Sequence, residues 1–186
     1  MRFIAILFST TILGMFSNAQ QTLSIRQDNR LAYNVTVNGQ TFPMFAQIDS
    51  LSPAYCSLTW NFEDGRSGRF IMEKNSLDNA GYGYWKQPVV GEELVLPASR
   101  SVLMLSRTVY SSLIKNKNAL FDDYAIAVKP APADNVFKLQ DKIVDALYLE
   151  SESGTKIWVL NNPSTPLILK MEGNPFHVNL ELIAID

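Results

Sequence analysis

The stretch that decides the fold is LAYNVTVNGQTFPMFAQI, residues 31–48. Apolar and polar residues alternate along its first half, and this period of two is typical of a strand with one buried face. Asn38-Gly39 follows, and these two residues tolerate the positive φ angles of a type I′ hairpin turn. The stretch therefore predicts a β-hairpin.

The two-residue turn also fixes the register of this hairpin. It places the apolar side chains of both strands on one face, through the pairs Leu31–Ala46, Tyr33–Met44 and Val35–Phe42. Pro43 then lies opposite Asn34. Because proline has no N–H to donate to the ladder, we expect the second strand to lie at a sheet edge or to bulge at Pro43.

The same alternation continues through the rest of the chain. It predicts further strands at Ala54–Phe62, Gly68–Met72, Ile157–Met171 and Phe176–Ile185, with shorter candidates at Leu94–Leu96, Val102–Leu105, Tyr124–Val128 and Val136–Leu139. Ile143–Leu149 is ambiguous. The phase of the pattern predicts that eight side chains are buried: Cys56, Leu58, Trp60, Trp158, Leu160, Leu167, Leu169 and Leu180. Ser57 falls on the outward face.

One segment departs from the period of two. Residues 107–117 have apolar side chains four apart, Ser106 is suited to cap a helix, and Asn118 is suited to end it. The predicted fold is therefore mostly β: a curled antiparallel sheet or half-barrel, with one main α-helix packed on its concave face or plugging it.

The first nineteen residues have the features of a cleavable signal peptide. Arg2 precedes an apolar run that is short for a membrane span, and Ser17-Asn18-Ala19 places small residues before a cut at Gln20. We expect residues 1–19 to be removed and residues 20–186 to form a single β-rich domain, periplasmic or secreted, without an integral membrane span.

Charge and cysteine content exclude several classes of protein. The 16 Lys and Arg residues, one of which is Arg2 of the leader, face 18 Asp and Glu residues, so the exported chain carries a net charge of about −3. This charge argues against a nucleic-acid partner, which normally requires a basic surface. A single cysteine, Cys56, allows no intrachain disulfide, and an exported domain without disulfides fits a bacterial envelope.

Three segments resemble exported bacterial domains of unknown function of the "3108-like" group. They are residues 67–80, residues 103–113 and, most specifically, residues 158–170 with the sequence WVLNNPSTPLILK. The resemblance implies a curved, mostly antiparallel sheet like those of periplasmic lipoprotein and lipid carriers. It implies no assigned reaction, and therefore no functional residues.

The candidate functional residues all have ordinary structural explanations. His177, the single histidine, is in phase with the polar side of the last strand, where an exposed histidine is the simpler interpretation. Cys56 points into the core, where a thiol is inert. The acidic pairs Asp122-Asp123, Glu92-Glu93 and Glu150/Glu152 lack the spacing of a calcium loop and are interpreted as solvated surface. For Gly81–Trp85, a glycine-relieved bend is favoured over an aromatic ligand platform.

No catalytic, cofactor-binding or metal-ligating residue is therefore predicted, and no cofactor. We expect an exported, non-catalytic domain that binds a lipid-like or other apolar molecule in its concave face. The alternative is a structural envelope protein with a filled interior that pairs with another envelope protein through an edge strand. A glycosidase-like pair of carboxylates, which sequence cannot reveal, is a secondary hypothesis.

Overall fold

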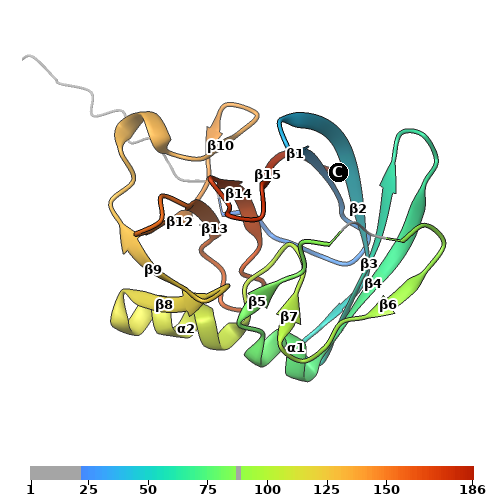
Figure 1. The fold of residues 1–186 in the computed structure, drawn as a ribbon, viewed down its shortest axis with the longest axis horizontal. Coiled ribbons are helices and arrows are strands. Elements are labelled where there is room, and N and C mark those ends of the chain that lie inside the picture. Colours follow the sequence, from blue (N-terminus) through green and yellow to red (C-terminus); the bar gives the residue numbers. More distant parts are fainter. Residues whose placement is uncertain (1–21, 87–88) are drawn as a thin grey trace, which may run out of the picture.

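The computed structural model describes residues 22–86 and 89–186, and its dominant element is one eleven-stranded sheet. The predicted leader and its cleavage point lie outside the described residues. Neighbouring strands are antiparallel except for β4 and β6, which pair in parallel. The sheet is curled but open, because its end strands do not pair with each other (Figure 1). Its order is β6 (Glu93–Val95), β4 (Ser67–Glu73), β3 (Tyr55–Phe62), β2 (Gln40–Ser52), β1 (Arg30–Val37), β15 (Val178–Ile185), β14 (Ile168–Glu172), β13 (Lys156–Leu160), β12 (Ala146–Ser151), β9 (Tyr124–Lys129) and β8 (Asn118–Phe121).

The pairing of β1 with β15 joins the two halves of the sheet. One arm is made of β1–β4 and β6, and the other of β15, β14, β13, β12, β9 and β8; Figure 1 shows them on either side of the molecule. A further link crosses between the arms, because the Tyr33 hydroxyl donates to the carbonyl oxygen of Ile168 at 2.9 Å. The hydrophobic core includes side chains from both arms, such as Trp60 in β3 and Trp158 in β13.

The remaining elements are short. They are α1 (Lys74–Asn79), α2 (Arg107–Asn116), a 3-10 helix η1 (Ala133–Asn135), the antiparallel pair β10 (Lys138–Leu139) and β11 (Lys142–Ile143), and the parallel pair β5 (Tyr82–Gly83) and β7 (Arg100–Ser101). The predicted fold class, a mostly β chain with a curled sheet and one main helix, is confirmed.

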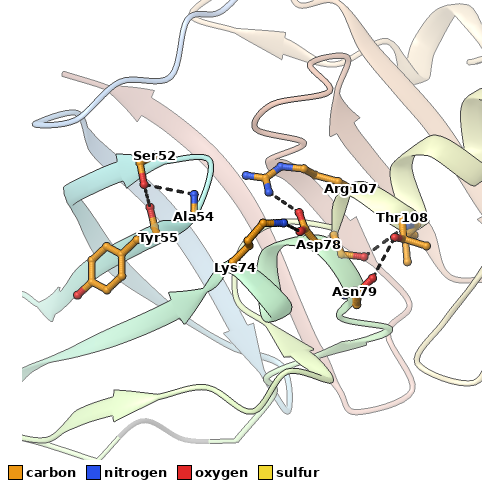
Figure 2. Close-up of polar contacts among 10 residues, drawn as sticks. Ser52, Ala54, Tyr55, Lys74, Asp78, Asn79, Arg107 and Thr108 are labelled. Atoms are coloured by element: carbon orange, nitrogen blue, oxygen red, sulfur yellow. Dashed lines mark hydrogen bonds and ion pairs between the residues drawn. The ribbon is translucent and has the colours of Figure 1, made fainter.

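Polar contacts hold the two helices together. Figure 2 shows Asp78 of α1 between Lys74 and Arg107, and Asn79 accepting from the Thr108 hydroxyl at 3.3 Å. The hydrogen bonds from Lys74 and Arg107 hold the pKa of Asp78 below its usual value. Ser106 caps α2 as predicted, accepting from the Val109 N–H at 3.3 Å. The helix ends at Lys117, which has a φ of 63°, and Asn118 begins β8 instead of ending the helix.

The hairpin prediction is confirmed in detail. β1 and β2 pair in the register expected from the Asn38-Gly39 turn, with Val35 opposite Phe42 and Asn34 opposite Pro43. All eight side chains predicted to be buried have exposed fractions of 5% or less. Ser57, assigned to the outward face, is also buried, and it lies between Ser50 and Ile71 of the flanking strands.

The prediction for Pro43 is correct only locally. β2 as a whole is an interior strand, and its bulge against β3 lies between Ile48 and Ser50, but at Pro43 the strand has no partner on the β3 side. Pairing with β3 begins only at Met44, opposite Phe62, the last residue of β3. In a two-residue hairpin the nitrogen opposite Asn34 points away from β1, toward the side on which β3 has already ended. Proline is tolerated because its missing N–H faces no partner strand.

Three shorter predictions need correction. Val102–Leu105 is not a strand, because Leu103 has a φ of 57° and only Met104 forms a bridge, to Leu167. The last strand begins at Val178, because His177 has a φ of 56° and interrupts the extended chain. Of residues 136–139, only Lys138 and Leu139 pair. The ambiguous segment 143–149 contributes the end of β11 and the start of β12.

Candidate functional site

A cavity of about 390 Å³ lies against the concave face of the sheet. One of its walls is the apolar face of the β1–β2 hairpin, extended across β15. The side chains of this wall are Val35, Val37, Phe42, Met44, Val178 and Leu180. The alternation that predicted the hairpin therefore also supplies the cavity wall.

The opposite wall comes from the chain between β4 and α2. Its residues 83–86 and 101–104 line the cavity. This segment contacts both arms: the Tyr84 ring lies 5.3 Å from that of Phe70, and the Ile168 N–H donates to the carbonyl oxygen of Leu103 at 2.8 Å. Figure 1 shows β5 and β7 between the arms. No residue of α2 lines the cavity among those described, so the segment, and not the main helix, covers this part of the concave face.

The contacts that Trp85 makes with Asp122, Gly83 and Phe176 fix the position of this wall. Asp122 accepts from the Gly83 backbone N–H at 2.9 Å and from the Trp85 indole N–H at 2.8 Å. A Cβ added at Gly83 would meet the Trp85 ring at 2.3 Å, so the indole lies directly over a position that only glycine can occupy. The outer side of Trp85 stacks on Phe176, with ring centroids 6.4 Å apart. Burial raises the pKa of Asp122, and the two hydrogen bonds offset part of the rise.

Burial along the cavity shows which end is open. In β1, Tyr33 is fully buried, Val35 is half-buried and Val37 is 36% exposed, although all three face the same side. Leu103, Met104 and Ile168 are buried at the other end. The cavity therefore opens toward the Asn38-Gly39 turn and is closed by apolar side chains at its base.

Polar groups are few in the lining. Arg66 and Lys86 are both exposed, and Asn38 and Gln40 lie near the hairpin turn. Ser101 is buried, and its hydroxyl donates to the carbonyl oxygen of Met104 at 2.7 Å. The deep part of the cavity offers a ligand mainly apolar surface, which favours apolar guests over water.

The candidate residues that lie outside the cavity have local roles. Cys56 is buried, and burial together with the charge of Asp49 raises the pKa of its thiol to about 12, so the thiolate that reacts with electrophiles is scarce. His177 is exposed in the turn before β15. Glu93 pairs with Arg69 at 3.2 Å, and Glu150 accepts from the Tyr148 hydroxyl. In residues 22–86 and 89–186, no group of three His, Cys, Asp or Glu residues could hold a metal ion.

Two interpretations change in the structure. Asp122, assigned to solvated surface, is 7% exposed and anchors the cavity wall. In the segment Gly81–Trp85, where a bend was expected, Tyr82 and Gly83 form the short strand β5, and Gly83, Tyr84 and Trp85 line the cavity. Arg66 and Lys86 were not singled out from the sequence, because a turn and a loop carry them and no periodic pattern marks such positions.

Comparisons with known proteins found no matching family model, no curated relative and no similar solved structure. The likeness to the 3108-like group stays a prediction. Within the part of the chain that the structure describes, no helix is both long enough and apolar enough to span a bilayer.

Proposed function

We propose that this protein is an exported, non-catalytic binding protein that holds an apolar small molecule between its sheet and the wall formed by residues 83–86 and 101–104. The observation that carries the proposal is the cavity of about 390 Å³ with an apolar wall and base. This volume lies within the range of known small-molecule sites, roughly 300–1,000 Å³. Much smaller engineered cavities, of about 150 Å³, already bind benzene when their walls are apolar.

The chemistry of the lining supports binding in preference to catalysis. Among the described residues, the lining includes no carboxylate, histidine or cysteine, which are the usual acids, bases and nucleophiles. Ser101 is the one lining hydroxyl from serine or threonine, and it already donates to Met104. The alternative, an envelope protein with a filled interior and an edge strand near Pro43, is less well supported, because the interior contains this cavity.

Export is part of the proposal. Its support is the charged start, apolar run and small residues of Met1–Ala19, which are typical of a cleavable signal peptide. The ligand would then be bound in the periplasm or outside the cell. Mass measurement of the protein recovered from the envelope tests this part: a chain starting at Gln20 supports it, and an intact leader contradicts it.

Binding is tested with N-phenyl-1-naphthylamine, a neutral dye whose fluorescence rises in apolar surroundings. Val35→Trp adds an indole to the cavity wall, and Thr36→Trp adds the same group to the opposite face of β1. We expect dye binding to the native protein, at least tenfold weaker binding to Val35→Trp, and little change for Thr36→Trp. Equal affinities for the two variants, with both folded by circular dichroism, would contradict the proposal.

A further inference from the structure

The charged residues that line the cavity are all of one sign. Arg66 and Lys86 are its two charged lining residues among those described, and no Asp or Glu joins them. This departs from the composition of the chain, in which acidic residues outnumber basic ones by 18 to 16. A ligand group placed beside this part of the lining would meet positive charge.

The two cations lie apart from the apolar base. Both are exposed, whereas Leu103, Met104 and Ile168 are buried. The cavity therefore has an apolar closed end and a cationic open end, which matches a molecule with a long apolar part and an anionic terminus.

Lys86 is the better placed of the two for this role. Arg66 already pairs with Asp64 at 2.7 Å, and its guanidinium lies 5.1 Å from the centre of the Phe62 ring. Lys86 forms no ion pair with any residue that the structure describes. A ligand anion can therefore bind Lys86 without displacing a carboxylate of the described residues.

The volume accommodates an apolar chain. At about 390 Å³ the cavity is more than twice the size of engineered cavities of about 150 Å³ that bind benzene, so a medium-length chain fits inside it.

We propose that the ligand is a single-chain amphiphile with an anionic head, its chain against Leu103 and Met104 and its head beside Lys86. This inference rests on the proposed binding function. A carboxylate and a phosphate monoester are the two head groups that share this chemistry.

The test measures displacement of N-phenyl-1-naphthylamine by three ligands with the same twelve-carbon chain. Laurate carries a carboxylate, lauroyl lysophosphatidate a phosphate, and methyl laurate no charge. A partly exposed ion pair increases affinity by up to about fivefold. We therefore expect at least one anion to bind two- to fivefold more tightly than the ester. This difference in affinity should become smaller at high salt, because salt screens the charges. The anion that shows the larger preference identifies the head group.

Variants of Lys86 test whether this residue causes the preference for an anionic ligand over the ester. Lys86→Gln should abolish it without changing affinity for the ester, Lys86→Arg should retain it, and Lys115→Gln, an exposed change on α2, should leave it intact. Equal binding of the anions and the ester, or a preference that survives Lys86→Gln, would overturn this inference while dye binding upholds the cavity function. Absence of binding by the dye and by all three ligands would overturn both.

Discussion

Asp122 and Gly83 together determine where the indole of Trp85 lies. Asp122 accepts its N–H, and the absence of a side chain at Gly83 leaves room for its ring. In the sequence, one of these residues is half of an acidic doublet and the other is a glycine in a bend, so neither indicates a role at Trp85. Their roles depend on a contact between the turn after β8 and the 82–85 segment, which no local spacing predicts.

Replacing Gly83 should disturb the cavity more than replacing the nearby Gly81. In Gly83→Ala the new methyl group would meet the indole at 2.3 Å, so the ring must leave its place. Gly81→Ala is the matched control, because a Cβ there meets nothing within 4 Å. We expect weaker dye binding and a shifted tryptophan emission for Gly83→Ala alone. Identical behaviour of the two variants would show that the indole position does not matter to the cavity.

The free energy of unfolding should depend on pH through the titration of Asp122. Because burial raises its pKa, the folded protein holds this proton more tightly than the unfolded chain does. Its contribution to folding is therefore greatest below the ordinary pKa of an aspartate and is lost as pH rises through the raised folded pKa. Asp122→Asn removes this dependence, so the stability of the native protein relative to the variant should fall with rising pH.

Urea unfolding between about pH 3.5 and 7 measures this difference, since that range spans the ordinary pKa of aspartate and values above it. Asp141→Asn, an exposed change in the turn between β10 and β11, controls for removal of a charge. A stability difference that grows with pH would mean that the hydrogen bonds from Gly83 and Trp85, and not burial, dominate the titration of Asp122.

At the scale of elements, the parts that could be predicted are those whose geometry is local. The Asn38-Gly39 turn fixes the pairing of β1 and β2, and Ser106 marks the start of α2. The predictions that fail, or hold only locally, concern residues whose structure depends on partners far away in the sequence. Pro43 is accommodated because β3 ends at Phe62, and Val102–Leu105 lies irregularly because it spans from β7 to a bridge with Leu167.

The cap of α2 offers a test at this scale. Ser106 is buried and accepts from the Val109 N–H, so Ser106→Ala leaves that donor without its partner. We expect a loss of about 1 kcal/mol in the free energy of unfolding, within the range of about 0.5–2 known for N-cap serines. Ser111→Ala, in the middle of the same helix, should be neutral or slightly stabilising, since alanine has the higher helix propensity. Equal losses of unfolding free energy in the two variants would show that Ser106 does not stabilise α2 by capping it.

At the scale of the whole molecule, the sequence predicts a curled sheet but not whether its concave face is hollow. Filled and hollow sheets have the same alternation, because Val35 and Val37 face inward in either case. The cavity exists because residues 83–86 and 101–104 lie over the sheet without filling the space above Val35. Its two cations, Arg66 and Lys86, come to the same opening only through this long-range arrangement.

Native mass spectrometry of the protein purified without removal of bound lipid tests whether the cavity holds an apolar ligand. We expect a population heavier than the bare chain, with the extra mass recovered by solvent extraction as a single-chain apolar molecule. The heavier population should persist in Thr36→Trp and disappear in Val35→Trp. A bare chain in the native protein, with no apolar molecule in the extract and no uptake of added laurate or its ester, would contradict this expectation.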